Sequence, residues 1–159
     1  MAIPKVYVET SVISYLTAKP SRDLIVAAHQ QVTREWWSRR KRFELFVSEA
    51  VVEEAKRGDK AAAARRKVAI EGIPILSAAA AAQTLAANFL QAAVMPSNAA
   101  IDAVHVAIAT THGMDFLITW NCTHIANAIV REKIETVRRN AGFRSPVICT
   151  PLELSEEES

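Results

Sequence analysis

Short runs of apolar and β-branched residues alternate with longer amphipathic segments along most of this chain. The apolar runs predict strands at residues 3–8, 43–47, 73–76, 116–120 and 147–149. Apolar spacing, capping residues and breakers predict a short helix after Thr10 and longer helices over 23–40, 48–58, 59–72, 77–94, 98–111 and 124–140. Strands that alternate with helices and read as unbroken apolar runs are typical of a parallel sheet with helices on both faces. We therefore expect an α/β fold: a three-layer α/β/α sandwich with a central, mainly parallel sheet.

The expected helix boundaries depend on local capping chemistry. Side-chain oxygens of Ser, Thr and Asp accept hydrogen bonds from the free N–H groups of a first helical turn. Gly and Pro favour the end of a helix. The expected N-caps are Thr10 or Ser11, Ser48, Asp59 and Ser77, and the expected stops are Gly58, Gly72, Pro74, Pro96 and Gly113.

Length and composition indicate one soluble globular domain. With 159 residues, 50% hydrophobic and 23% charged, and only 4 Gly and 6 Pro, the sequence differs from collagen-like, low-complexity and disordered chains. No apolar run approaches the ~20 residues of a membrane span, and the start MAIPKVYVETS lacks a signal-peptide pattern. We expect a single domain over residues 1–152 and an acidic, frayed tail over residues 153–159.

The cysteine content favours a reducing compartment. Cys122 and Cys149 are too few for a disulfide framework and have no C-x-x-C spacing. We expect both to be buried as small hydrophobic side chains, in a cytoplasmic protein that has no contact with a membrane.

The charges are unevenly distributed along the chain. Four of the 17 acidic residues stand in the last seven positions, and all 19 Lys and Arg precede them. The basic residues form one group over residues 34–42 and a second over residues 56–67. Such groups suit a polyanionic partner, but they are equally typical of solvated helix faces.

Polar residues that directly follow the predicted strands are the first candidates for a functional site, because ligands of open parallel sheets bind beyond the carboxyl ends of the strands. These residues are Glu9, the group Ser48, Glu49, Glu53 and Glu54, and Asn121. Asp102 is a further candidate, since it stands in an otherwise small and apolar helix and an unpaired buried charge is costly. Converging carboxylates suit Mg²⁺ or Mn²⁺ and phosphodiester hydrolysis. A surface Glu9, an Asp102 near a helix N-terminus and a turn-forming Asn121 explain the same residues without a site.

Four segments stand in order along the chain: VYVETSVISYL, VSEAVVEEAKRGD, IDAVHVAIATTHGMDFLITWN and a final short strand near VICTP. Together they resemble the PIN-domain nucleases, the fold of the toxin halves of VapBC-type toxin–antitoxin modules. The resemblance spans residues 3–151. It implies a metal-dependent endoribonuclease that cleaves single-stranded RNA with Mg²⁺ or Mn²⁺. It also implies a cognate antitoxin and a homodimer, for which the Ala-rich helices and Trp36 and Trp37 offer apolar surface.

The resemblance assigns site roles by position. Glu9 takes the place of the first metal-site acid, where the family usually has Asp, and Asp102 matches the third. Glu54 matches the second acid best, with Glu53 as its rival. Asn121 stands where many members have a fourth Asp. The implied catalytic residues are Glu9, Glu54, Asp102 and Asn121, the implied metal ligands Glu9 and Asp102, and the hydroxyls that orient them Thr10, Ser11 and Thr119.

The basic group around residue 40 is expected to hold the RNA backbone through Arg39, Arg40 and Arg42. Trp36 and Trp37 stand beside it and offer stacking surfaces for unpaired bases. Neighbouring residues on a helix point about 100° apart, so at most one of the two indoles is expected to face the core.

Two other functions compete with the nuclease. A degenerate PIN domain that binds nucleic acid or a protein without cutting is favoured by Glu9 and Asn121, which depart from the family pattern. An unrelated small α/β phosphatase or nucleotide-binding protein is disfavoured, because no Gly-rich phosphate loop is present. Among the histidines, His105 is expected to be a packing residue within reach of Asp102, and His124 either contacts substrate or ends a turn.

Overall fold

The computed structural model describes residues 2–155 and contains a five-stranded parallel sheet in the order β3-β2-β1-β4-β5. The strands are β1 Lys5–Val8, β2 Glu44–Ser48, β3 Ile75–Leu76, β4 Phe116–Ile118 and β5 Val147–Cys149. Each neighbouring pair is parallel, with Tyr7 of β1 opposite Phe46 of β2 and Leu117 of β4. Residues 156–159 of the expected tail lie outside the described part of the chain.

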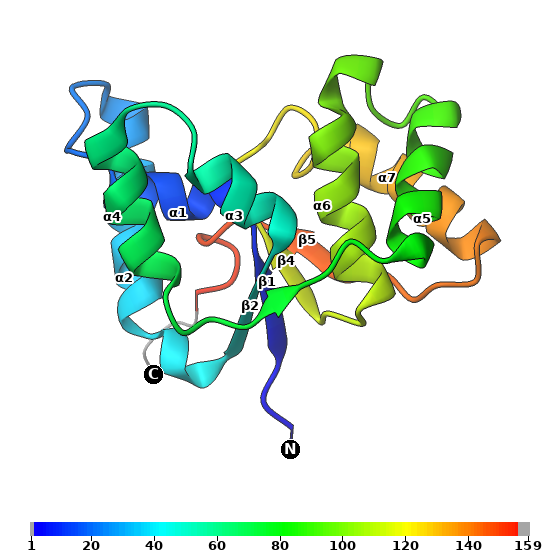
Figure 1. Cartoon of the computed structure of the whole chain (residues 1–159), viewed down its shortest axis with the longest axis horizontal. Helices are drawn as coiled ribbons and strands as arrows, with labels where there is room; N and C mark the ends of the chain where they lie inside the picture. The colour runs from blue at the N-terminus through cyan, green and yellow to red at the C-terminus, as the bar shows by residue number, and fades with distance from the viewer. Residues whose placement is uncertain (1, 156–159) are drawn as a thin grey trace.

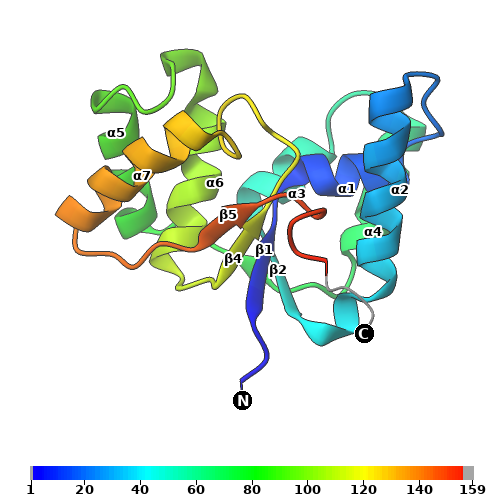
Figure 2. The same ribbon diagram turned by 180° about the vertical axis from the view of Figure 1, so that it is seen from behind.

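Helices lie on both sides of this sheet, as Figures 1 and 2 show. They are α1 Thr10–Thr17, α2 Leu24–Ser38, α3 Glu49–Ala55, α4 Lys60–Ile70, α5 Ala80–Gln91, α6 Ala100–Thr111 and α7 Ala128–Asn140, with 3₁₀ turns η1 Arg40–Arg42 and η2 Ser97–Ala99. Helices α1, α2 and α4 lie on one side, and α5, α6 and α7 on the other. The predicted three-layer α/β/α sandwich is confirmed.

The apolar side chains of β1 suit its position in the middle of the sheet, where both of its faces are buried. Val6, Tyr7 and Val8 are each 0% exposed, so both faces of the strand are covered. On one face lies α6, whose Ala103, Val106 and Ala107 are also fully buried. Small side chains on α6 let a helix approach the sheet closely, and burial of this apolar surface is the main stabilising contribution to the fold.

The strand order reverses at β1, and this reversal positions a crevice. The chain moves outward from β1 through β2 to β3, then crosses to the other side for β4 and β5. Helices connected to neighbouring strands diverge at such a point, which leaves space above the carboxyl ends of the strands. Glu9 at the end of β1 and Thr119 at the end of β4 both lie at this edge.

Three helix starts differ from the sequence prediction. The N-cap of α1 is Glu9, whose carboxylate accepts a hydrogen bond from the Ser11 backbone N–H, and not Thr10 or Ser11. Helix α5 begins after Ala79 without a side-chain cap, although Ser77 was the expected cap. Helix α7 begins after Asn127, because the residues from Asn121 to Ala126 first form a hydrogen-bonded turn.

The cysteine prediction is half wrong. Cys149 is buried in β5 as expected, but Cys122 is exposed, because it follows β4 in the turn that precedes α7.

Only one of the two neighbouring tryptophans faces the core, as their helical spacing predicts. Trp36 is 2% exposed and stacks on Phe43, whereas Trp37 is half-buried. Among the helices of residues 2–155, none combines the length and apolar character needed to cross a membrane.

Candidate metal centre at the carboxyl edge of the sheet

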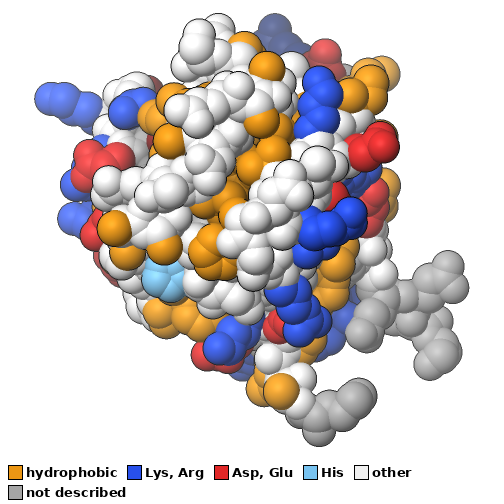
Figure 3. Space-filling view, turned by 90° about the vertical axis from the view of Figure 1, so that its right-hand side faces the viewer, with side chains coloured by type: hydrophobic (Ala, Val, Ile, Leu, Met, Phe, Trp, Pro, Cys, Tyr) orange, Lys and Arg blue, Asp and Glu red, His pale blue; other side chains and the backbone are white. Residues whose placement is uncertain are grey.

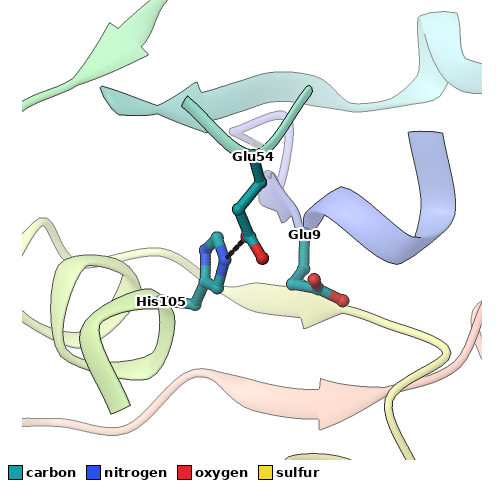
Figure 4. A group of neighbouring side chains, drawn as sticks. All are labelled: Glu9, Glu54 and His105. Carbon is teal, nitrogen blue, oxygen red and sulfur yellow. Dashed lines mark hydrogen bonds and ion pairs between the residues drawn. The ribbon is translucent and has the colours of Figure 1, made fainter. Parts of the chain in front are cut away.

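Glu9, Glu54 and His105 meet at the carboxyl edge of the sheet, each from a different element (Figure 4). Glu9 follows β1, Glu54 belongs to α3 and His105 to α6. One ligand atom from each residue lies within 4.8 Å of the other two. Glu9 and His105 are buried and Glu54 is half-buried, so solvent screens this group of charges only partly.

The Glu9 carboxylate is held by three hydrogen-bond donors. The Ser11 hydroxyl donates to Oε1 over 2.5 Å, the Ser11 backbone N–H donates to Oε2 over 3.1 Å, and the Thr119 hydroxyl donates to Oε1. The Ser11 hydroxyl also accepts a bond of 2.8 Å from the Trp120 backbone N–H. The ends of β1 and β4 are thereby joined around one carboxylate, which contacts two of the predicted orienting hydroxyls, Ser11 and Thr119.

Glu54 is the acid of α3 that joins Glu9, and Glu53 is not. The Thr10 hydroxyl donates to Glu54 Oε1 over 2.7 Å, and His105 Nε2 hydrogen-bonds to the same oxygen. Glu53 instead forms a surface ion pair of 3.2 Å with Lys56, in which both side chains are 66% exposed. Successive residues on a helix point about 100° apart, which is why only one of the two acids can face the crevice.

The pKa of the Glu54 carboxyl lies below its ordinary value. Burial by itself would raise this pKa, but the hydrogen bond and charge of His105, the Thr10 hydroxyl and the charge of Arg57 together outweigh burial. Glu54 is therefore ionised at neutral pH, as a cation ligand must be.

His105 belongs to the site, which the sequence did not reveal. Its side chain is fully buried, with Nε2 bonded to Glu54 and Nδ1 within 2.5 Å of the Tyr7 hydroxyl. Burial by itself would lower the pKa of this imidazole, but the bond to Glu54 and the nearby carboxylates raise it. His105 is buried as expected of a packing residue, but its hydrogen bonds go to Glu54 and Tyr7. The available signal was a polar residue one turn after Asp102 in an otherwise apolar helix.

Asp102 lies in the first turn of α6 and contacts His124. Its Oδ2 is 2.9 Å from His124 Nδ1, and both side chains are partly exposed. Asp102 adds negative charge near His105, since it contributes to the raised pKa of that imidazole. The structure thus brings Asp102 to the border of the Glu9–Glu54–His105 group, with His124 as its direct partner.

Asn121 shapes the turn that presents His124. Its Oδ1 accepts a hydrogen bond of 3.0 Å from the His124 backbone N–H, and its backbone carbonyl accepts from Ile125 and Ala126. The Asn121 side chain is therefore used in the turn and does not contact the Glu9–Glu54–His105 group through any hydrogen bond in residues 2–155.

The predicted RNA-binding residues Arg39, Arg40 and Arg42 lie at the opposite edge of the sheet. Arg40 and Arg42 belong to η1 and Arg39 directly precedes it, so all three lie just before β2, at the amino ends of the strands (lower part of Figure 1, cyan). Arg40 covers the ring of Trp37 at 4.7 Å, and Arg39 and Arg42 line a pocket with Leu152 and Ser155. The second basic group is nearer the acids, since Arg57 affects the pKa of Glu54.

Comparison with known proteins identifies the fold. No family model matches the sequence, and no curated protein sequence matches it significantly. Among solved structures, Mycobacterium tuberculosis VapC20, a Sarcin-Ricin loop cleaving toxin, matches with a TM-score of 0.57 and 16% identity over 87% of this chain and 96% of that one. VapBC2 from Rickettsia felis, bound to a DNA fragment from its promoter, matches with a TM-score of 0.57 and 12% identity over 91% and 96%. The chain has a VapC-like PIN-domain fold.

Proposed function

We propose that this protein is a metal-dependent endoribonuclease that cleaves single-stranded RNA, and that it is the toxin of a toxin–antitoxin pair. The observation that carries the proposal is the meeting of two carboxylates, Glu9 and Glu54, with His105 at the carboxyl edge of a VapC-like fold. VapC20, which shares this fold, is a toxin that cleaves the Sarcin-Ricin loop, and its activity supports the same reaction class.

The residues present fit a divalent cation. Glu9 and Glu54 supply oxygen ligands, and Asp102 lies one helical turn from His105 on α6. Hard oxygen ligands with a net negative charge suit Mg²⁺ or Mn²⁺. We propose that Glu9, Glu54 and Asp102 hold the cation, with His105 orienting Glu54. A bound cation would make water a better nucleophile and stabilise the charge that develops on a phosphate.

The remaining residues position these acids. Ser11 and Thr119 fix the Glu9 carboxylate, and Thr10 fixes the Glu54 carboxylate. Asn121 holds the turn that places His124 against Asp102. Because His124 is partly exposed at this border, its imidazole is placed to bind a phosphate oxygen or to exchange a proton with water.

The RNA backbone needs positive charge near the acids. Lys56, Arg57 and Lys60, at the end of α3 and the start of α4, are the basic residues that we propose for this role. The predicted contribution of Arg39, Arg40 and Arg42 requires an RNA that continues around the molecule to the amino edge of the sheet.

An antitoxin and a second copy of the chain are the proposed protein partners. The likeness to VapBC2 from Rickettsia felis supports the first. Hydrophobic side chains gather in a band on the face that carries α5 and α7 (Figure 3), which supports the second. A homodimer through this face would place the apolar band in an interface, where its burial is favourable.

The alternative is a PIN-like domain that binds without cutting. Two observations favour it: Glu9 stands in place of the usual Asp, and the Asn121 side chain is occupied in a turn. The two functions differ in their need for a cation, which makes metal-dependent cleavage the deciding measurement.

The test compares cleavage of a mixed-sequence single-stranded RNA reporter by wild type, Asp102→Asn, Glu54→Gln and Glu53→Gln, each with Mn²⁺ or Mg²⁺ and with chelator. We expect metal-dependent cutting by wild type and Glu53→Gln. Loss of one cation ligand should reduce the rate by about 100-fold or more in the other two variants, equivalent to about 2.7 kcal/mol of barrier. Glu53→Gln is the matched control, since it makes the same change one residue away. Cutting that survives chelation, or equal rates for all four proteins, would contradict the proposal.

A further inference from the structure

Three nearly parallel aromatic rings form a cluster beside the acidic site. They belong to Tyr15 of α1, His29 of α2 and Trp120, two residues after β4. The His29 and Trp120 rings are 4.1 Å apart and tilted by 12°, so they lie face to face. Tyr15 is nearly parallel to both, with centroids 5.9 Å from Trp120 and 6.3 Å from His29.

Trp120 anchors this cluster to the acidic site. Its ring is buried, and its Nε1 donates a hydrogen bond of 2.7 Å to the Thr33 hydroxyl of α2. Its backbone N–H donates to the Ser11 hydroxyl, which in turn donates to Glu9. Ser11 and Tyr15 are four residues apart on α1 and therefore share one face of that helix. The rings are thus held in a defined position relative to the Glu9 carboxylate.

Two members of the cluster remain accessible. Tyr15 and His29 are both half-buried, in contrast to the buried Trp120. Within residues 2–155, the hydroxyl of Tyr15 and the imidazole nitrogens of His29 make no hydrogen bond, and the two rings contact each other and Trp120. Packing of α1 against α2 needs only apolar surface. Flat rings with free polar edges also offer what an unpaired nucleobase requires, a stacking face and hydrogen-bonding groups.

The two tryptophans near residue 40 are used differently. Trp36 is buried against Phe43, and the ring of Trp37 is covered by the Arg40 guanidinium. The stacking surface nearer the acids is therefore on Tyr15 and His29, which the sequence did not single out.

We propose that Tyr15 and His29 form a stacking subsite for one unpaired base of the RNA whose phosphate lies at Glu9 and Glu54. This inference rests on the proposed function for its ligand, single-stranded RNA. Every base has a flat face, so the subsite sets the position of the strand and does not select its sequence. It restricts the site to nucleic acid with at least one base free of a duplex.

The test measures binding of two dye-labelled probes at low salt with Ca²⁺ as the divalent cation, because Ca²⁺ binds carboxylate oxygens and neutralises them towards a phosphate but supports phosphodiester hydrolysis poorly. One probe is a six-nucleotide single-stranded RNA, and the other is an abasic ribose–phosphate strand of equal length. The proteins are wild type, Tyr15→Leu, His29→Leu, the ring-retaining Tyr15→Phe and His29→Phe, and His112→Leu. His112 lies at the far end of α6 from Asp102 and serves as the matched histidine control.

We expect wild type to bind the RNA at least about fivefold more tightly than the abasic strand, which corresponds to one stacked base. The Leu variants should lose that preference while binding the abasic strand as before, and the Phe variants and His112→Leu should keep it. A variant that failed to fold would also lose the abasic strand. Equal binding of both probes by wild type, or an unchanged preference in the Leu variants, would overturn the subsite.

A parallel cleavage assay separates this inference from the proposed function. Base-dependent binding without metal-dependent cutting would retain the subsite and reject the nuclease. Metal-dependent cutting with the same KM in wild type, Tyr15→Leu and His29→Leu would retain the nuclease and reject the subsite.

Discussion

A continuous set of hydrogen bonds links the middle of the core to the acidic site. The Tyr7 hydroxyl, at the centre of the sheet, contacts Ser48 Oγ at 2.7 Å and His105 Nδ1 at 2.5 Å, and His105 continues to Glu54. Burial, opposed by the bond to Ser48, raises the pKa of the Tyr7 hydroxyl well above its ordinary value, so it stays protonated. Buried polar atoms of this kind are stabilising only while each has a partner.

Removal of the Tyr7 hydroxyl should therefore destabilise the fold. Tyr7→Phe leaves His105 Nδ1 and Ser48 Oγ each without one buried partner, and we expect a loss of about 1–3 kcal/mol in the free energy of unfolding. Urea denaturation measures this loss. Tyr15→Phe is the matched control, because the Tyr15 hydroxyl makes no hydrogen bond in the described residues. Equal effects of the two substitutions would show that the buried network contributes nothing.

The two cysteines should differ in reactivity. Burial, reinforced by the charge of Glu153, raises the pKa of the Cys149 thiol from 9.0 to about 12, whereas Cys122 is exposed. At pH 8 we expect iodoacetamide to modify Cys122 in the native protein and both residues in denaturant, with mass spectrometry as the readout. The raised pKa also predicts a contribution to stability that is complete below pH 9 and is lost as the pH rises toward 12. Modification of native Cys149 at the rate of Cys122 would contradict this assignment.

At the level of single elements, caps decide where helices begin. Glu9 shows this most clearly, since one carboxylate caps α1 and also belongs to the candidate metal centre. A carboxylate can cap as Ser or Thr does, which is why Thr10 and Ser11 were equally plausible from the sequence. Helix α7 begins later than the apolar pattern predicts, because the residues after β4 first form a turn held by Asn121, and the helix starts only after Asn127.

The cap of α7 gives a quantitative prediction. Asn127 Oδ1 accepts hydrogen bonds from the Ile129 and Val130 backbone N–H groups. We expect Asn127→Ala to reduce the free energy of unfolding by about 1 kcal/mol. Asn140→Ala, at the exposed end of the same helix, should change it by less than about 0.5 kcal/mol. Thermal denaturation of both variants checks the comparison, and a larger effect at Asn140 would show that the cap is unimportant.

For the molecule as a whole, the proposed cation should stabilise the fold. A ligand that binds only the folded state adds about 2.7 kcal/mol when its concentration is 100 times its Kd. We expect Mn²⁺ to raise the Tm of wild type and of Glu53→Gln, and chelator to reverse the rise. Glu54→Gln should lose most of the shift, because Glu54 and not Glu53 faces Glu9. An equal shift in both variants would place the cation elsewhere.

The fold could be predicted from the sequence because the patterns that specify its helices and strands are local. Apolar runs, caps and breakers predicted every strand of the sheet, and the alternation of strands with helices predicted its layers. The location of the site at the carboxyl edge of the sheet could also be predicted, since parallel strands end together and Glu9 directly follows one of them.

The contacts within the site could not be predicted from the sequence, because they join residues that are distant along the chain. Thr119 and Glu9 are 110 residues apart, Tyr7 and His105 98, and His105 and Glu54 51. Such contacts depend on strand order and on how each helix is rotated about its axis. A rotation of about 100° separates Glu53 on the surface from Glu54 in the site, and strand direction alone places Arg39, Arg40 and Arg42 at the far edge. Local patterns therefore determined the elements and the edge, whereas the packing of helices against the sheet determined which side chains meet there.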